Sequence, residues 1–150
     1  MYNFIHYQVR DVMTSRPMTI GRRTVIRDVE DIFDEHDFNG LPVVDENQRL
    51  IGMLTKLDVL KAFVFTTKEK VPPYDAIMSE EISRVMTTSL KNFSPETPLT
   101  RVLQEMMETG HKSFPVVEND RLIGVVARED ILRALRQAGL GQLPERLESA

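Results

Sequence analysis

The chain has 150 residues, a formal net charge of −4 and no cysteine. Its charges of both signs are interspersed, which leaves no basic stripe for a phosphate backbone, so nucleic-acid binding is not expected. The lack of thiols excludes disulfides, thiolate zinc sites and cysteine nucleophiles. We expect a cytoplasmic protein with neither a signal peptide nor a membrane span, because the longest apolar runs are only a few residues.

The first predicted elements are a short extended piece near residues 18–20 and a helix that begins after a Thr24 N-cap. Apolar residues recur there at helical spacing, which indicates an amphipathic helix. These residues are Val25, Ile26, Val29, Ile32 and Phe33.

Two short apolar runs follow, "GLPVV" at 40–44 and "LIGML" at 50–54, separated by Asp-Glu-Asn-Gln. They predict a β-hairpin with Pro42 at a strand start. A second helix is expected next, with Leu57, Leu60 and Val64 as its apolar positions. The polar stretch "TTKEKVPP" at 66–73 is typical of a linker, which we assign to residues 67–81.

The same order of elements returns after the linker. "VMT" at 12–14 aligns with "VMT" at 85–87, and "RLIGMLTKLDVLKAF" at 49–63 aligns with "RLIGVVAREDILRAL" at 121–135. The second copy predicts an extended piece near 92–93, a helix capped by Thr97 with Pro98 first, a hairpin with Pro115 at a strand start, and a last helix. Its apolar helix positions are Leu99, Val102, Leu103, Met106, Met107, Ile131, Leu132 and Leu135.

The duplication predicts a first unit over 1–66, a second unit over 82–138 and a flexible tail over 139–150. Each unit has "VMT" at its start, "LPVVD" or "FPVVE" in the middle, and "LIGMLTKLD" or "LIGVVARED" near its end. This ordered set resembles a pair of cystathionine-β-synthase (CBS) domains, a Bateman module. The resemblance implies two β-α-β-β-α units packed sheet to sheet with pseudo-twofold symmetry, two clefts that hold adenosyl ligands, and dimerisation of the module.

By resemblance, Gly52, Thr55 and Asp58 match a segment that offers a hydroxyl to phosphate and a carboxylate to a ribose diol. A carboxylate can accept two hydrogen bonds from adjacent hydroxyls, and the helix start at Lys56 exposes N–H groups. The alternative is a capping box, in which Thr55 and Asp58 bond each other's backbone. Both interpretations can hold together.

In the second copy, Ala127 replaces the threonine and Asp130 remains, so the first cleft is expected to bind phosphates better. The resemblance also places Asn39 and Lys112 near the phosphates. The remaining candidate ligand-binding residues are Lys56, Arg128, Met18, Pro42 and Pro115. His36, in "DEHD", is interpreted as part of a solvated helix face, not as a metal ligand.

The preferred hypothesis is a regulatory module that senses AMP, ADP, ATP, NAD or S-adenosylmethionine, with no tightly bound cofactor and no metal. The alternative is a structural dimerisation module with empty clefts. An enzyme is not expected, because no nucleophile, base and metal set is assembled. We expect a homodimer whose output passes through a separate effector protein that the sequence does not identify.

Overall fold

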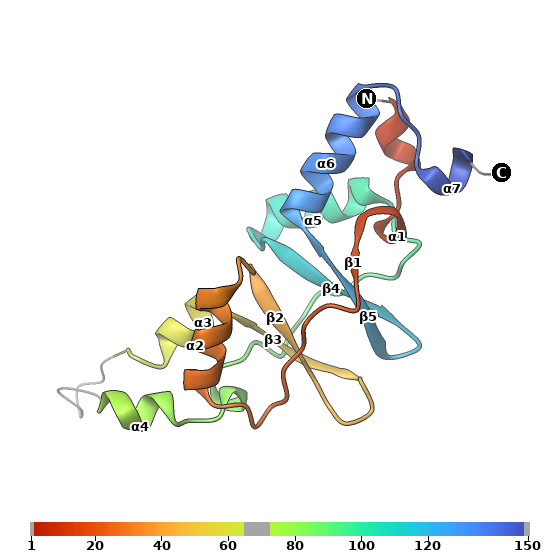
Figure 1. Cartoon of the computed structure of the whole chain (residues 1–150). Helices are drawn as coiled ribbons and strands as arrows, with labels where there is room; N and C mark the ends of the chain where they lie inside the picture. Colours follow the sequence, from red (N-terminus) through yellow and green to blue (C-terminus); the bar gives the residue numbers. More distant parts are fainter. Residues whose placement is uncertain (1, 65–72, 149–150) are drawn as a thin grey trace. The chain divides into compact units, whose positions relative to one another are not determined.

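The computed structural model describes residues 2–64 and 73–148. The chain forms two compact units, which we call the terminal unit (residues 1–17 and 91–150) and the central unit (residues 18–90). Each combines helices with antiparallel strands, so the predicted mixed α+β class is confirmed. Figure 1 follows these elements along the chain.

The terminal unit is built from both ends of the chain. Its N-terminal part contains η1 (Tyr2–His6), α1 (Val9–Val12) and β1 (Thr14–Ser15). Its C-terminal part contains α5 (Leu99–Thr109), β4 (Ser113–Glu118), β5 (Arg121–Ala127), α6 (Arg128–Gly139) and α7 (Glu145–Glu148). The sheet has the order β1-β5-β4, and Phe93 adds a parallel bridge to Val116 in β4.

The central unit contains the hairpin of the first repeat and the start of the second repeat. Its elements are α2 (Ile26–Glu35), β2 (Gly40–Val44), β3 (Leu50–Thr55), α3 (Lys56–Lys61), α4 (Tyr74–Met78) and η2 (Ile82–Arg84). Strands β2 and β3 are antiparallel neighbours. Ile20 bridges Val43 in parallel, and Thr87 bridges Met53 in the antiparallel sense. The extended pieces predicted near 18–20 and 92–93 are thereby confirmed.

The compact units do not follow the order of the sequence repeats. Strand β1 belongs to the first repeat, yet it pairs with β5 of the second repeat. In the same way Thr87 belongs to the second repeat and pairs with Met53 of the first. Each sheet is therefore completed by the opening "VMT" segment of the other repeat.

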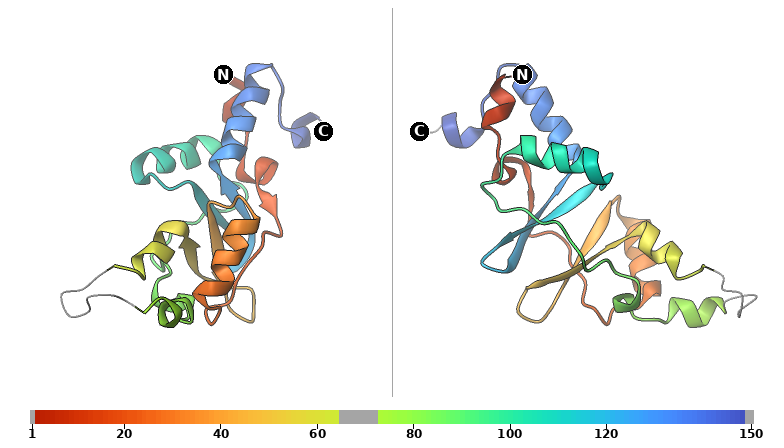
Figure 2. Two further views of the ribbon diagram at one scale, coloured as in Figure 1. Left: turned by 60° about the vertical axis from the view of Figure 1, so that its left-hand side comes forward. Right: turned by 180° about the vertical axis from the view of Figure 1, so that it is seen from behind.

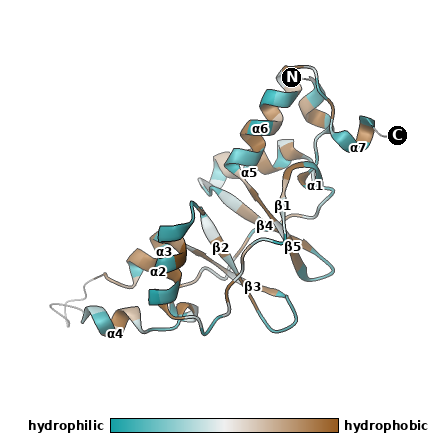
Figure 3. Ribbon diagram, viewed as in Figure 1, coloured by the Kyte–Doolittle hydropathy of each residue, from teal (hydrophilic) through white to brown (hydrophobic). Residues whose placement is uncertain are grey.

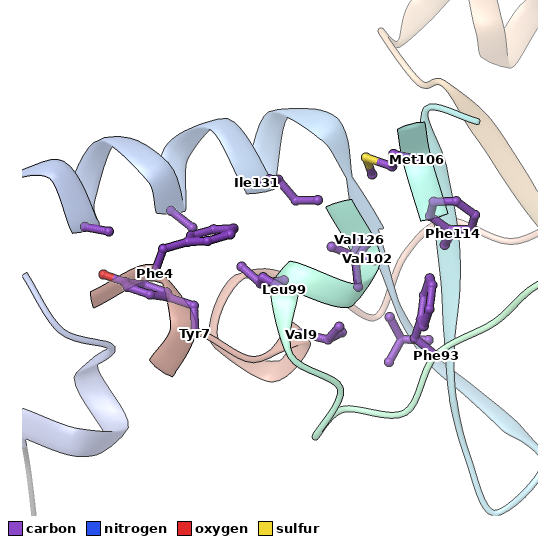
Figure 4. Packing of buried hydrophobic residues seen from close by; sticks show 13 residues of the cluster. Phe4, Tyr7, Val9, Phe93, Leu99, Val102, Met106, Phe114, Val126 and Ile131 are labelled. Atoms are coloured by element: carbon purple, nitrogen blue, oxygen red, sulfur yellow. The ribbon is translucent and has the colours of Figure 1, made fainter. Parts of the chain in front are cut away.

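The core of the terminal unit lies between its hairpin and its helices. Phe114 and Val116 of β4 and Val126 of β5 are packed with buried residues of α5, α6 and η1. Figure 4 shows Phe4 and Tyr7 of η1 in the same cluster as Leu99 of α5. Figure 2 shows the helices α5 and α6 beside the β4–β5 hairpin from two further directions. A single layer of helices therefore covers one face of this sheet.

The central unit buries one face of α2 against its hairpin. Ile26 and Val29 are fully buried, and Ile32 and Phe33 pack against the same cluster. Figure 3 shows the hydrophilic and hydrophobic stretches along α2. This arrangement confirms the predicted amphipathic helix, whose apolar stripe repeats at the helical period.

The apolar face predicted for the second helix is wrong in part. Leu57, Leu60 and Val64 are exposed, while Val59 and Phe63 pack on the core of the central unit. The side chain that α3 buries most deeply is the carboxylate of Asp58, and the predicted stripe faces outward. Leu132 of α6 and Met107 of α5 are also exposed, whereas their neighbours Ile131 and Met106 are buried as predicted.

The predicted helix caps are each one residue too early. Helix α2 has Val25 as its N-cap and α5 has Pro98, and both of these residues have extended backbone angles. The carbonyl of Thr24 accepts a hydrogen bond from Ile82, and that of Thr97 accepts one from Val9. Because both threonines are held by a segment of the other repeat, their backbones stay outside the helix.

The central prolines lie inside their strands and not at the strand starts. Pro42 is the third residue of β2 and faces Met53, and Pro115 is the third residue of β4. Met53 uses its N–H and carbonyl to bond Thr87. The missing N–H of Pro42 is therefore not required by the β2–β3 ladder.

The segments assigned to linker and tail contain regular structure where the structure describes them. Of the predicted linker, residues 67–72 lie outside the described residues, and α4 follows with Ile77 and Met78 buried. In the tail, Arg146 bonds the carboxylate of Asp11 at 3.0 Å and the carbonyl of His6 at 2.6 Å. These contacts hold the C-terminal residues against the N-terminal arm.

Candidate functional site

The Asp58 carboxylate is the centre of the candidate site in the central unit. It lies in the first turn of α3, directly after β3, and only 2% of its surface is exposed. The Thr55 hydroxyl accepts a hydrogen bond from the Asp58 N–H at 3.2 Å, and the Thr55 N–H donates to the Asp58 Oδ2 at 3.0 Å. The capping box proposed from the sequence is thus formed.

Two further groups donate to the same carboxylate. The Thr87 hydroxyl lies 3.2 Å from Oδ1 and 3.3 Å from Oδ2 of Asp58, and the Lys61 ammonium lies 3.0 Å from Oδ1. Neither residue is among the ligand-binding residues predicted from the sequence. The repeated "VMT" segments marked Thr87 as one of a pair, but only the strand exchange between the repeats brings it to Asp58.

A glycine fixes the position of Thr87. The backbones of Thr87 and Met53 exchange two hydrogen bonds of 2.9 Å. A Cβ atom added to Gly52 would lie 2.7 Å from the Met86 sulfur and 3.1 Å from the Thr87 carbonyl oxygen. The "LIG" sequence therefore leaves space for the opening segment of the other repeat, which carries the hydroxyl to the carboxylate.

The terminal unit contains the equivalent arrangement around Asp130. This side chain is 6% exposed, and its Oδ2 accepts a hydrogen bond of 2.8 Å from the Ala127 N–H. Arg133 is 3.4 Å from Oδ1. Burial raises the pKa of the Asp130 carboxyl, although the Ala127 N–H and the Arg133 guanidinium act in the opposite direction. No hydroxyl is bonded to Asp130 within the described residues.

The same glycine packing recurs in the terminal unit. A Cβ atom at Gly124 would lie 2.8 Å from both the Met13 sulfur and the Thr14 carbonyl oxygen. Thr14 faces Val125 in the β1–β5 ladder. The two units thus share one arrangement, in which a glycine on the last strand leaves space for the "VMT" segment of the other repeat.

Two of the predicted basic residues, Lys56 and Arg128, precede Asp58 and Asp130 by two positions in the chain. The Arg128 N–H donates to the Lys112 carbonyl at 3.0 Å, which makes these two residues neighbours at the ends of their elements. The Arg128 side chain pairs with Glu129 at 3.1 Å. In the central unit, the Lys56 ammonium lies 5.9 Å from the centre of the Phe33 ring.

The remaining predicted ligand-binding residues differ in how exposed they are to solvent. Met18 is exposed and Asn39 is half-buried, while Pro42 and Pro115 are buried inside their strands. The prolines present only backbone carbonyls, which bond Ile20 and Phe93. A ligand role for these four residues stays a prediction.

Neither a metal cluster nor a membrane helix is found in residues 2–64 and 73–148. No group of three or more acidic or histidine side chains there could hold a metal ion. His36 is exposed and stacks on Phe38 with ring centres 4.9 Å apart. No helix in this part of the chain is long and apolar enough to cross a bilayer.

Each copy of the repeat therefore carries one buried aspartate at the same helix start. The family model "CBS domain" matches residues 9–65 and 82–137. The chain belongs to the CBS domain family, as the duplicated motifs indicated.

Relatives and solved structures agree with this assignment. A homoserine O-acetyltransferase of Methanococcoides burtonii is 31% identical over 90% of this chain, which spans only 26% of that enzyme. The CBS domain pair of protein MJ0100, in complex with 5-methylthioadenosine and S-adenosyl-L-methionine, has a TM-score of 0.72 and 27% identity, and the match covers 88% of this chain and 98% of that one. CBSX2 in complex with AMP has a TM-score of 0.76 and 27% identity, covering 89% and 98% of the two chains.

Proposed function

We propose that this chain is a regulatory module that binds an adenosine-containing ligand through Asp58 and Asp130. The observation that carries the proposal is a buried carboxylate repeated at the same place in both units. A buried charge is costly unless it is paired, and natural chains keep such groups where they bind or switch. The solved relatives with AMP and with S-adenosyl-L-methionine support the ligand class.

The residues around Asp58 suit a nucleoside monophosphate. The Thr55 hydroxyl accepts a hydrogen bond from the Asp58 N–H, so its own proton can be donated to a phosphate oxygen. Lys56 and Arg128 stand at the helix starts, two positions before Asp58 and Asp130, and the Arg128 side chain is paired with Glu129. We assign no tightly bound cofactor, and the choice among AMP, ADP, ATP, NAD and S-adenosylmethionine is left to experiment.

A second candidate function is a dimerisation module with empty clefts. The observation in its favour is the group of exposed apolar side chains formed by Leu57 and Leu60 of α3 and by Val64, which follows this helix. The Asp58 carboxylate is also already bonded by three groups of its own chain. Both features are compatible with a purely structural role.

The melting temperature distinguishes the two functions. It is measured with each of the five ligands, for the wild type and for the double variant D58N/D130N. A ligand present at 100 times its dissociation constant adds about 2.7 kcal/mol to the free energy of unfolding. We expect at least one ligand to raise the melting temperature of the wild type and not of the double variant. No change with any of the five would leave the structural module as the better description.

A further inference from the structure

The Asp58 carboxylate has too few free acceptor positions for both hydroxyls of a ribose diol. A carboxylate offers roughly four lone-pair positions. Three donors already occupy most of them: Lys61 on Oδ1, the Thr55 N–H on Oδ2, and the single Thr87 hydroxyl proton, which lies within reach of either oxygen. With 2% of the side chain exposed, a ligand can reach it only by displacing one of these donors.

The three donors differ in how easily they can move. The Thr55 N–H belongs to the backbone of the capping box, and Thr87 is fixed by its two backbone bonds to Met53. Lys61 is different, because its side chain is 57% exposed and carries its ammonium on a flexible four-carbon stem. An ion pair whose cation is exposed to water is weak, so moving Lys61 into water costs less free energy than moving Thr55 or Thr87.

We propose that Lys61 is a positioning residue that closes the Asp58 site in the ligand-free protein and must leave the carboxylate when a ribose binds. The inference rests on the proposed function, and it adds how this site is controlled. Lys61 keeps the buried charge compensated while the site is empty and competes with the ligand for the same oxygen. Its removal should therefore lower stability and raise affinity at once.

The Asp130 site has the same type of ion pair, with Arg133 three residues along the helix, but fewer donors on its carboxylate. Its carboxylate accepts the Ala127 N–H at 2.8 Å and a longer contact of 3.4 Å from Arg133, and no hydroxyl of the described residues bonds it. Acceptor positions therefore remain for a diol. The two sites consequently differ in how much protein must move before the ribose is bound.

The test isolates the Asp58 site in a D130N background and uses AMP as the probe. K61M is compared with K61R, which keeps the ion pair, and with K91M, which removes an exposed lysine of the terminal unit. Calorimetric titration gives the AMP affinity, and a melting curve without ligand gives the stability of the empty protein.

We expect K61M to bind AMP about three- to tenfold more tightly while its ligand-free melting temperature falls. K61R and K91M should leave the affinity at the level of the background. A lower melting temperature with unchanged or weaker AMP binding in K61M would overturn the inference, because Lys61 would then be structural or a ligand contact. If the wild type itself shows no AMP binding, the proposed function fails for this ligand and the inference fails with it.

Discussion

At the residue scale, two aspartates at the same position of the repeat have different surroundings. Asp58 is held by a capping box, a threonine hydroxyl and a lysine, whereas Asp130 has one backbone donor and an ion pair of 3.4 Å with Arg133. The single change from Thr55 to Ala127 does not account for this difference alone. Thr87 and Lys61 contribute as much to the environment of Asp58 as Thr55 does.

The variant D58N tests whether this carboxylate serves a ligand as well as a cap. Asparagine keeps an oxygen for the Thr55 N–H but loses the charge that pairs with Lys61, so the empty protein should lose about 1 to 2 kcal/mol of stability. The rise in melting temperature caused by the best ligand should fall sharply. Melting curves of wild type, D58N and D130N, each with and without ligand, measure both effects. An unchanged ligand effect in both variants would contradict the ribose assignment.

The raised pKa of Asp130 predicts a pH dependence of stability. Between the ordinary aspartate pKa of about 3.9 and the raised value, the folded protein holds a proton that the unfolded chain has lost. The free energy of unfolding should therefore fall as the pH rises through this window. D130N has no carboxyl at this position, so its free energy of unfolding should lack this fall. The gap that ionisation of Asp130 opens between wild type and D130N should therefore be smaller at low pH than at neutral pH.

Urea unfolding at a series of pH values from 4 to 7 measures the effect of this carboxyl. The exposed acid Asp34 provides the control variant D34N, whose profile should follow that of the wild type. A parallel profile for wild type and D130N would show that Asp130 titrates normally in the folded protein.

At the element scale, the decisive contact is the strand exchange between the repeats. The segments around Met13 and Met86 cross the last strand of the opposite repeat directly over Gly124 and Gly52. Each crossing pairs a threonine with the last strand of the other repeat, and in the central unit this threonine also bonds Asp58. Stability and site geometry therefore depend on the same close approach.

The variant G124A should destabilise the terminal unit by about 1 to 3 kcal/mol. The added methyl group would lie 2.8 Å from the backbone oxygen of Thr14, which cannot move without breaking β1 away from β5. G139A is a matched control, because a Cβ atom at this helical position meets nothing within 4 Å and alanine favours a helix. Urea unfolding compares the two variants. Equal stability of G124A and wild type would mean that β1 is not held as closely as the packing at Gly124 requires.

At the scale of the whole molecule, the exposed apolar side chains of α3 and α6 indicate self-association. Leu60 is 63% exposed and Leu132 is 62% exposed, on helices that occupy equivalent places in the two repeats. Large apolar residues grouped on one helix face mark an interaction surface more often than scattered ones do. The family resemblance suggests a second copy of the chain as the partner.

We therefore predict a homodimer at micromolar concentration. Light scattering should give about twice the chain mass of 17.3 kDa for the wild type. L60E should shift the mass toward one chain, because a carboxylate in an apolar interface loses its hydration. The exposed change E30Q on α2 serves as control. A wild type with the mass of a single chain would contradict the prediction.

The sequence by itself determined the parts of this protein that depend on local pattern. Helical spacing located α2 and α5, the paired apolar runs located both hairpins, and the duplicated motifs indicated the CBS family. The Thr55–Asp58 capping box also followed from spacing, since its two residues are three apart on one helix start. In each case the interacting groups are near neighbours along the chain.

The tertiary structure alone decided which groups surround each carboxylate. Thr87 lies 29 positions from Asp58 in the chain and reaches it only because the opening segment of one repeat completes the sheet of the other. Leu57, Leu60 and Val64 likewise face outward against the prediction from their spacing, because Val59, Phe63 and Asp58 take the inward positions. Periodicity identifies an apolar stripe, but packing against the rest of the unit decides which residues of the helix face the core.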